Sequence, residues 1–212
     1  WNEDLKNLNE GYETGKYRES EFFLGIQKYT PETELYIIRR AWNSIIGDFP
    51  KNRLEFLENI VPKYKLFLLS NTDATHIDVV ERELGKDFYN RFVSCFEKVY
   101  FSFEVGMRKP NEEIFKFVLE ENNLNPKTTL FVDDNFDNIE GAKKVGLKTW
   151  HLQVGNEDVI ELEDYIKKIQ IEGRVLGDIA RNHVIPTAIR YQNILIENVK
   201  GLKEIFGKDF EQ

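Results

Sequence analysis

The chain has 212 residues, enough to bury a sizeable core as one domain with an insertion or an appendage. Its 37 acidic residues outnumber 29 lysines and arginines, and the formal charge of −8 argues against nucleic acid or an anionic membrane as the main partner. A single cysteine excludes an internal disulfide, and no cysteine and histidine cluster suggests zinc, so we expect a cytoplasmic protein.

The sequence shows neither a membrane-spanning run nor an N-terminal signal pattern. No apolar run is long enough to span a bilayer, and the N-terminus lacks a basic segment followed by an apolar one. Because translation starts at methionine, we expect that a chain starting at Trp1 begins part-way through a longer protein.

Residues 1–62 show helical spacing without strand-like alternation and predict an all-α unit. Thr30 followed by Pro31 is typical of a helix start, and Gly47 and Pro50 interrupt the pattern. The apolar positions of the two helices on either side of this break are Leu35, Ile38, Trp42 and Ile45, then Leu54, Leu57 and Ile60.

From residue 63 to residue 160, strand and helix patterns alternate. We expect strands at 64–69, 96–101, 129–132 and 147–152, with helical spacing between the first two and between the later ones. This order predicts an α/β fold, a Rossmann-like parallel sheet with helices on both faces.

The last segment, residues 161–212, has no strand signal and repeats apolar residues at helical spacing. Pro186 should kink the helix or separate two helices. The apolar positions are Ile166, Ile169, Leu176 and Ile179, then Ile189, Leu195, Val199 and Leu202.

An acidic pair, Asp133 and Asp134, follows directly after the expected strand at 129–132, and Asn138 comes four residues later. Ligands bind at the carboxyl ends of strands in open α/β sheets, and oxygen ligands suit Mg²⁺. The alternative is that the two carboxylates only cap the following helix, where aspartate is favoured in any case.

Two other strand ends supply polar groups, Ser70 with Asn71 and, from the loop after residue 101, Lys109. A hydroxyl and backbone N–H groups at a helix start can cradle phosphate, and a lysine adds a positive charge. Together with a metal at the acidic pair, these groups make most of a phosphoryl-transfer site that lacks a nucleophile.

These segments resemble the second, third and fourth motifs of the haloacid dehalogenase-like (HAD) hydrolases, in the same order. They are Leu68-Leu69-Ser70-Asn71-Thr72, Gly106-Met107-Arg108-Lys109-Pro110 and Phe131-Val132-Asp133-Asp134-Asn135-Phe136-Asp137-Asn138. The resemblance covers residues 1–160, with residues 1–62 as the family's small cap. It implies a phosphatase in which Ser70 and Lys109 hold the phosphoryl group of a small phosphorylated substrate. Asp134 is then the main Mg²⁺ ligand, with Asp133 and Asn138 in support.

The family's first motif, a strand ending in a nucleophilic aspartate, belongs before the cap and has no match here. We therefore expect the chain as given to fold imperfectly and not to hydrolyse phosphate esters. Two other functions stay open, a phosphate-binding pseudoenzyme and a structural or assembly element. Dehalogenation is disfavoured, because that chemistry needs no metal and would give the acidic pair no role.

The C-terminal segment carries a second resemblance. The stretches Asn182-His183-Val184-Ile185-Pro186-Thr187-Ala188 and Tyr191-Gln192-Asn193-Ile194-Leu195-Ile196-Glu197 are similar to the C-terminal helical region of type III glutamine synthetases. None of that enzyme's substrate or metal motifs is present, so the join implies two unrelated pieces. The apolar stripe of this segment could drive self-association.

Several remaining side chains have simpler interpretations. His76 is expected to cap a helix or lie on the surface, and Cys95 to be a small core residue. The aromatic residues of the first sixty positions are expected to form the cap core; they are Phe22, Phe23, Tyr36 and Trp42.

Overall fold

The computed structural model describes residues 2–206, and their side chains except those of residues 173, 177, 183 and 198–206. The chain divides into two compact units, Trp1–Ile160 and Glu161–Gln212, which we describe separately. Within the described residues, every helix is too short or too polar to cross a membrane.

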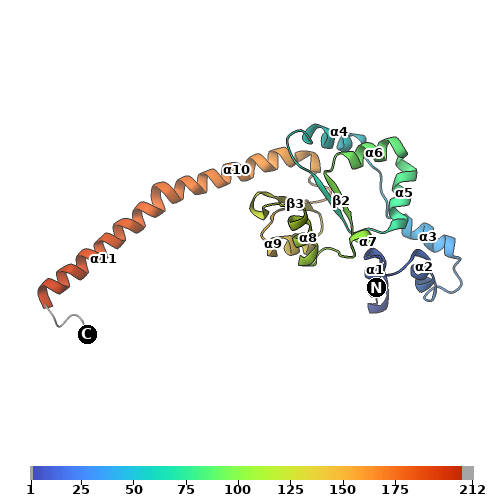
Figure 1. Ribbon diagram of the computed structural model, residues 1–212, viewed down its shortest axis with the longest axis horizontal. Coiled ribbons are helices and arrows are strands. Elements are labelled where there is room, and N and C mark those ends of the chain that lie inside the picture. The colour runs from blue at the N-terminus through green and yellow to red at the C-terminus, as the bar shows by residue number, and fades with distance from the viewer. Residues whose placement is uncertain (1, 207–212) are drawn as a thin grey trace. The chain divides into compact units, whose positions relative to one another are not determined.

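The first unit opens with four helices: α1 (Glu3–Glu13), α2 (Glu19–Gln27), α3 (Leu35–Asn43) and α4 (Lys51–Ile60) (Figure 1). The first three enclose an aromatic core in which the Tyr12 and Phe22 rings stack at 4.2 Å between centroids. The other members of this core are Phe23, Ile38, Leu8, Ile26 and Trp42. The prediction of an aromatic cap core is thus confirmed, except that Tyr36 is 68% exposed.

The predicted helix start at Thr30 is wrong. The Thr30 N–H donates to the Gln27 carbonyl at 3.0 Å, so this residue closes the last turn of α2. α3 begins only at Leu35, after a further turn in which the Thr33 N–H donates to the Thr30 carbonyl at 2.9 Å. The local cap signal was overridden by the hydrogen bonds of the preceding helix.

Four short parallel strands follow, close to where the sequence predicts them: β1 (Phe67–Ser70), β2 (Lys98–Phe101), β3 (Leu130–Asp133) and β4 (Lys148–His151). β1 pairs with β2, and β3 pairs with β4. Among the described residues no strand hydrogen bonds join the two pairs, so the sheet is divided into two halves.

The connections between strands are helical, as the alternating pattern predicts, which confirms the α/β fold class. They are α5 (Ala74–Leu84), α6 (Lys86–Ser94), α7 (Ser102–Val105), α8 (Glu112–Glu121) and α9 (Phe136–Lys144), with 3₁₀ turns at Pro126–Thr128 and Val159–Glu161. The sequence analysis expected one helix between the first two strands and missed α6, none of whose residues is fully buried. Gly85, with φ of 78°, ends α5 and lets α6 start in a new direction.

Both half-sheets pack on one apolar cluster formed by Ile114 and Phe115 of α8 and Ala142 of α9. Leu69 of β1 and Phe131 of β3 both lie against it. The shared cluster holds the ends of β1 and β3 on the same side of the core, which positions the polar residues that follow these two strands.

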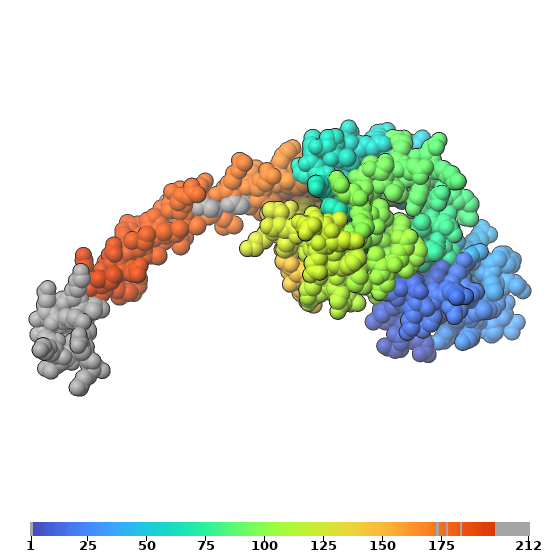
Figure 2. Space-filling view, in the orientation of Figure 1, coloured from blue at the N-terminus to red at the C-terminus, as the bar shows by residue number. Residues whose placement is uncertain are grey.

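The second unit consists of α10 (Leu162–Ile179), a π-helical segment (Ala180–Val184) and α11 (Ile185–Phe206). Pro186 lies in the first turn of α11, directly after the π segment. The backbone stays right-handed helical at Ile179 and Ile185, so regular α-helix is interrupted by the π segment before the proline and is not divided into two separate helices. Figure 2 shows the described part of this unit as a single thickness of helix. Its exposed apolar side chains are Ile171, Val175, Leu176, Ile179, Val184, Ile185, Ile189, Tyr191, Ile194, Leu195 and Ile196. Val199 and Leu202 lie outside the described side chains.

Candidate phosphate site at the strand ends

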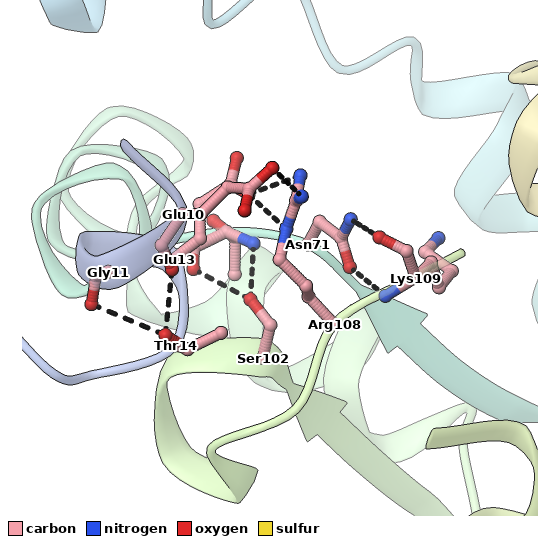
Figure 3. A network of polar contacts seen from close by, with 9 residues as sticks. Glu10, Gly11, Glu13, Thr14, Asn71, Ser102, Arg108 and Lys109 are labelled. Carbon is pink, nitrogen blue, oxygen red and sulfur yellow. Dashed lines mark hydrogen bonds and ion pairs between the residues drawn. The ribbon is translucent and has the colours of Figure 1, made fainter. Parts of the chain in front are cut away.

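The chain leaves β1 through Ser70 and Asn71 and enters α5 at its N-cap, Asp73. Ser102, at the end of β2, fixes this turn with two hydrogen bonds. Its hydroxyl accepts from the Thr72 N–H and donates to the Thr72 carbonyl, both at 3.0 Å (Figure 3). The turn after β1 is therefore held by the neighbouring strand, with Ser70 half-buried at the strand end.

Asn71 holds the loop that carries Lys109. Its side-chain amide donates to the Lys109 carbonyl at 2.8 Å, and its side-chain oxygen accepts from the Lys109 N–H at 2.9 Å (Figure 3). Because both ends of this amide are used by the Lys109 backbone, the Asn71 side chain positions the lysine.

The Lys109 ammonium lies between the two half-sheets. It donates to the Leu69 carbonyl of β1 at 2.8 Å and to Oδ2 of Asp133 at the end of β3 at 2.7 Å. Both side chains of this ion pair are buried, with 9% and 7% of their surface exposed. An ammonium has three N–H donors, so one remains for a ligand.

Asp133 is held from two more directions. Its Oδ1 accepts from the Asn135 N–H at 2.8 Å and from the side-chain amide of Asn138 at 3.0 Å. Asn138 is buried in the first turn of α9. The structure thus brings Lys109, Asp133 and Asn138 together as one hydrogen-bonded group.

The alternative in which the acidic pair caps the following helix is wrong. The N-cap of α9 is Asn135, whose side-chain oxygen accepts from the Asp137 N–H at 2.9 Å and from the Asn138 N–H at 3.3 Å. Asp134 keeps an exposed carboxylate just outside the helix. The acidic pair is therefore available for roles other than capping.

Of the two aspartates expected to bind metal, Asp133 is paired with Lys109, and Asp134 forms no ion pair with any described residue. The oxygens of Asp133 are occupied by Lys109, Asn135 and Asn138. Within the part of the chain that the structure describes, no group of three or more histidine, cysteine, aspartate or glutamate side chains could hold a metal ion. These residues therefore fit one ligand position of a magnesium site and leave the others unfilled.

The cap reaches this site through Arg108, next to Lys109. The guanidinium donates to Glu10 at 3.0 Å and to Glu13 at 2.8 and 2.9 Å, both on α1 (Figure 3). The Thr14 hydroxyl donates to the Glu10 carbonyl at 2.7 Å and secures the end of that helix. The first helix of the cap is thus tied to the loop that carries the lysine.

Comparison with known proteins identifies the same family that the motifs at these strand ends resemble. Residues 16–146 match the family model of haloacid dehalogenase-like hydrolases. The chain belongs to this family. Residues 142–203 match the glutamine synthetase C-terminal domain.

Two relatives represent the HAD part of the chain. A HAD family enzyme from Bacteroides thetaiotaomicron has a crystal structure with a TM-score of 0.67 at 34% identity, covering 75% of this chain and 78% of that one. Further crystal structures of that enzyme contain magnesium and inorganic phosphate. D-ribitol-5-phosphate phosphatase from the same species is 28% identical over 120 residues, 55% of this chain and 57% of the relative. Family members thus use magnesium and act on small phosphorylated substrates.

The tail has its own relative. Glutamine synthetase from Bacteroides fragilis is 56% identical over 50 residues, 24% of this chain and 7% of that enzyme. The chain therefore spans little more than half of the matched phosphatase and a small fraction of the matched synthetase. The prediction of a HAD-like hydrolase with a glutamine synthetase-like tail is confirmed.

A second polar group in this HAD protein was missed by the sequence analysis. His76, expected to be a cap or a surface residue, is buried, and its Nδ1 lies 3.0 Å from Oδ2 of Asp73. The N-cap of α5 is Asp73, which accepts from the His76 N–H at 2.9 Å. Burial lowers the pKa of His76, but the hydrogen bond to Asp73 and its charge outweigh this effect, so the pKa is raised overall. The spacing of aspartate and histidine three residues apart was visible, but the burial depends on the cap.

Proposed function

We propose that this chain contains the cap and the phosphate-binding part of a magnesium-dependent phosphatase that acts on a small phosphate ester. Ser70 and Lys109 hold the phosphoryl oxygens, and Asn71 positions Lys109. Asp134 is one ligand of the metal, while Asp133 and Asn138 hold the lysine and the strand end in place. The matched ribitol-phosphate phosphatase supports a polyol or sugar phosphate as the substrate class.

The observation that carries this proposal is the position of the Lys109 ammonium. It is buried at the meeting point of the two half-sheets, beside the ends of β1 and β3, and has one donor left. A charge-assisted hydrogen bond from such a buried donor to a phosphate oxygen is roughly twice as strong as a neutral one. An anionic ligand at these strand ends would therefore gain from a cation that is already fixed in place.

The proposal also needs a nucleophile, and we propose that it comes on a strand from outside the described residues. The edge of β1 supports this. The Leu66 carbonyl accepts from the Glu97 N–H at 2.8 Å, so it points toward β2. Because backbone N–H and C=O groups of alternate residues point to opposite edges of a strand, those of Phe67 and Leu69 point away from β2. The Leu69 carbonyl on that free edge is the group that accepts from Lys109.

The edge of β3 is open in the same way. The Thr129 carbonyl accepts from the Lys148 N–H at 3.1 Å on the side of β4, so the peptide groups of Leu130 and Val132 point away from β4. Neither edge is paired with any other described strand. An added parallel strand that ends in an aspartate would meet Lys109. Attack of that carboxylate on phosphorus would break the P–O bond to the alcohol of the ester, which leaves with a proton from solvent, and water would then hydrolyse the aspartyl-phosphate to release inorganic phosphate.

Phosphate binding tests the part of the proposal that rests on this chain. Calorimetric titration with inorganic phosphate should show binding to the chain, weakened about tenfold in Ser70→Ala, which loses one hydrogen bond to the anion. The variant with Lys109→Met and Asp133→Asn together should lose more, because it removes the charge-assisted contact. Lys116→Met, which removes an exposed lysine on α8, is the matched control and should bind like the parent. Equal binding by all four proteins would contradict the proposed site.

The tail supports a second function, an assembly role. Its exposed apolar residues include neighbours on the helix surface such as Val175, Leu176 and Ile179, which are 51%, 66% and 46% exposed. Contiguous apolar surface of this kind marks an interaction site. If the tail directs self-association, deletion of residues 162–212 should abolish it without changing phosphate binding.

A further inference from the structure

The cap is joined to the core through Trp42 of α3, which contacts Asp73 and His76 at the start of α5. The indole N–H donates to Oδ2 of Asp73 at 3.1 Å. The backbone carbonyl of the same tryptophan lies 3.2 Å from Nε2 of His76. The indole and imidazole rings stack at 5.3 Å between centroids, with 5° between their planes.

The partners of the imidazole determine its protonation state. Nδ1 faces a carboxylate oxygen of Asp73 at 3.0 Å, and Nε2 faces the carbonyl oxygen of Trp42. Both partners can only accept hydrogen bonds. A neutral histidine has one N–H and would leave its other ring nitrogen facing an acceptor, so both contacts are made only by the imidazolium form.

Burial strengthens this argument. Asp73 is 1% exposed and His76 is 6% exposed. A buried carboxylate without a counterion is costly, and the imidazolium is the cation that lies against Asp73. The flat cation also stacks on the indole face, a favourable arrangement for a positive charge.

One further charged group, on α1, raises the pKa of His76 as Asp73 does. Burial lowers the pKa of the imidazole, and the contacts with Asp73 and the Trp42 carbonyl raise it. The negative charge of Glu13 on α1 is a smaller effect that also raises it. Glu13 is itself bound to Arg108. Next to His76 in the chain, Thr75 shares a hydrogen bond with Tyr12 of α1. Burial raises the pKa of the Tyr12 phenol, and the positive charge of Arg39 on α3 is one of the smaller effects that lower it.

We propose that protonated His76 is a latch that holds the cap on the core, and that loss of its proton as the pH rises releases α3. Deprotonation removes one of the two ring hydrogen bonds, ends the cation stacking on Trp42 and leaves the Asp73 carboxylate buried without its counterion. The contact therefore weakens between α3 and the start of α5, while α8 and α9, which supply none of these hydrogen bonds, stay in place. The latch is independent of the phosphatase assignment.

The direction with pH follows from the pKa of His76, which is raised in the folded protein. A raised pKa means that the stabilisation is fully present below the ordinary histidine value of about 6.5 and is lost as the pH rises through the folded value. The cap should thus be closed in mildly acidic solution and loosen in alkaline solution.

Two measurements on the full chain test the latch. In two-bond proton–nitrogen NMR spectra, His76 should show both ring nitrogens protonated at about pH 6 and should titrate above the ordinary value. Hydrogen exchange, corrected for the intrinsic pH effect, should show protection of α3 amides falling several-fold from about pH 5.5 to about pH 8.5, with α8 amides unchanged.

Two variants show whether the pH dependence of α3 protection comes from His76 or from a pH-dependent loss of stability of the whole unit. His76→Gln cannot carry the charge, so protection of α3 should be low at acid pH already and nearly independent of pH. His151→Gln, on β4 and away from the cap, is the matched control and should keep the parent profile. A neutral His76 at about pH 6, or the same pH profile in His76→Gln as in the parent, would overturn the proposal. So would a loss of α8 protection in step with α3.

Discussion

Replacing Lys109 by methionine is the most informative single perturbation of the proposed site. Methionine keeps the length and the apolar stem of the side chain and removes the ammonium. The change leaves the Asp133 carboxylate, 7% exposed, without its cation, and leaves the Leu69 carbonyl without the donor at 2.8 Å. Breaking a buried ion pair by removing one partner costs about 3–5 kcal/mol.

Urea denaturation at neutral pH measures this cost. With a slope of about 2 kcal/mol per molar urea, typical of small proteins, the midpoint should fall by roughly 2 M. Since the whole stability of a domain is about 5–15 kcal/mol, Lys109→Met takes a large share of it. Lys116→Met breaks an ion pair whose side chains are 54% and 43% exposed, and should leave the midpoint unchanged.

A second substitution shows whether the lost stability comes from the unpaired carboxylate. Adding Asp133→Asn to Lys109→Met removes the buried charge, and the double variant should recover most of the loss, to within about 1–2 kcal/mol of the parent. The reasoning would be refuted if Lys109→Met were as stable as Lys116→Met, or if the double variant were less stable than Lys109→Met alone.

Three further outcomes are expected. In Gly141→Ala the added Cβ on α9 would lie 2.2 Å from the Pro110 carbonyl oxygen, so the free energy of unfolding measured with urea should fall by about 1–3 kcal/mol. The control Gly47→Ala, whose added Cβ meets nothing within 4 Å, should keep the parent value. The melting temperature of the parent should fall from about pH 6 to about pH 8 because His76 loses its stabilising proton, and His76→Gln should show a flatter profile in the same calorimetric series. Light scattering after size exclusion should show concentration-dependent association of the full chain and a monomer after deletion of residues 162–212; a monomeric full chain would contradict a role of the exposed tail residues in assembly.

The strands and the polar residues at their ends could be predicted from the sequence, because both signals are local. An apolar run that ends in Ser70 and Asn71, or in Asp133 and Asp134, is visible in a few consecutive residues. The sequence analysis placed Lys109 and Asp133 at strand ends of one site, but it did not predict the ion pair between them.

The features that the sequence analysis missed depend on contacts between distant segments. Thr30 carries a good cap signal, yet its N–H is used by α2. Asn135 caps α9 in place of the acidic pair, because the Asp133 oxygens are drawn to Lys109 and Asn138. His76 becomes a buried partner of Asp73 only when Trp42, 34 residues earlier, covers it. Spacing alone does not show which surface another element will cover.

Phosphate release from a small polyol or sugar phosphate, measured with magnesium, tests the central claim most directly. The assay compares the chain as given with the same chain preceded by an apolar strand that ends in aspartate. We predict no release above the protein-free control for the chain as given, because its sequence has no match to the family's first motif, the strand that ends in the nucleophilic aspartate. The extended chain should release phosphate, and should stop doing so when Lys109→Met and Asp133→Asn are introduced together. Hydrolysis by the chain as given, or hydrolysis by the extended chain that survives loss of Lys109, would contradict the account.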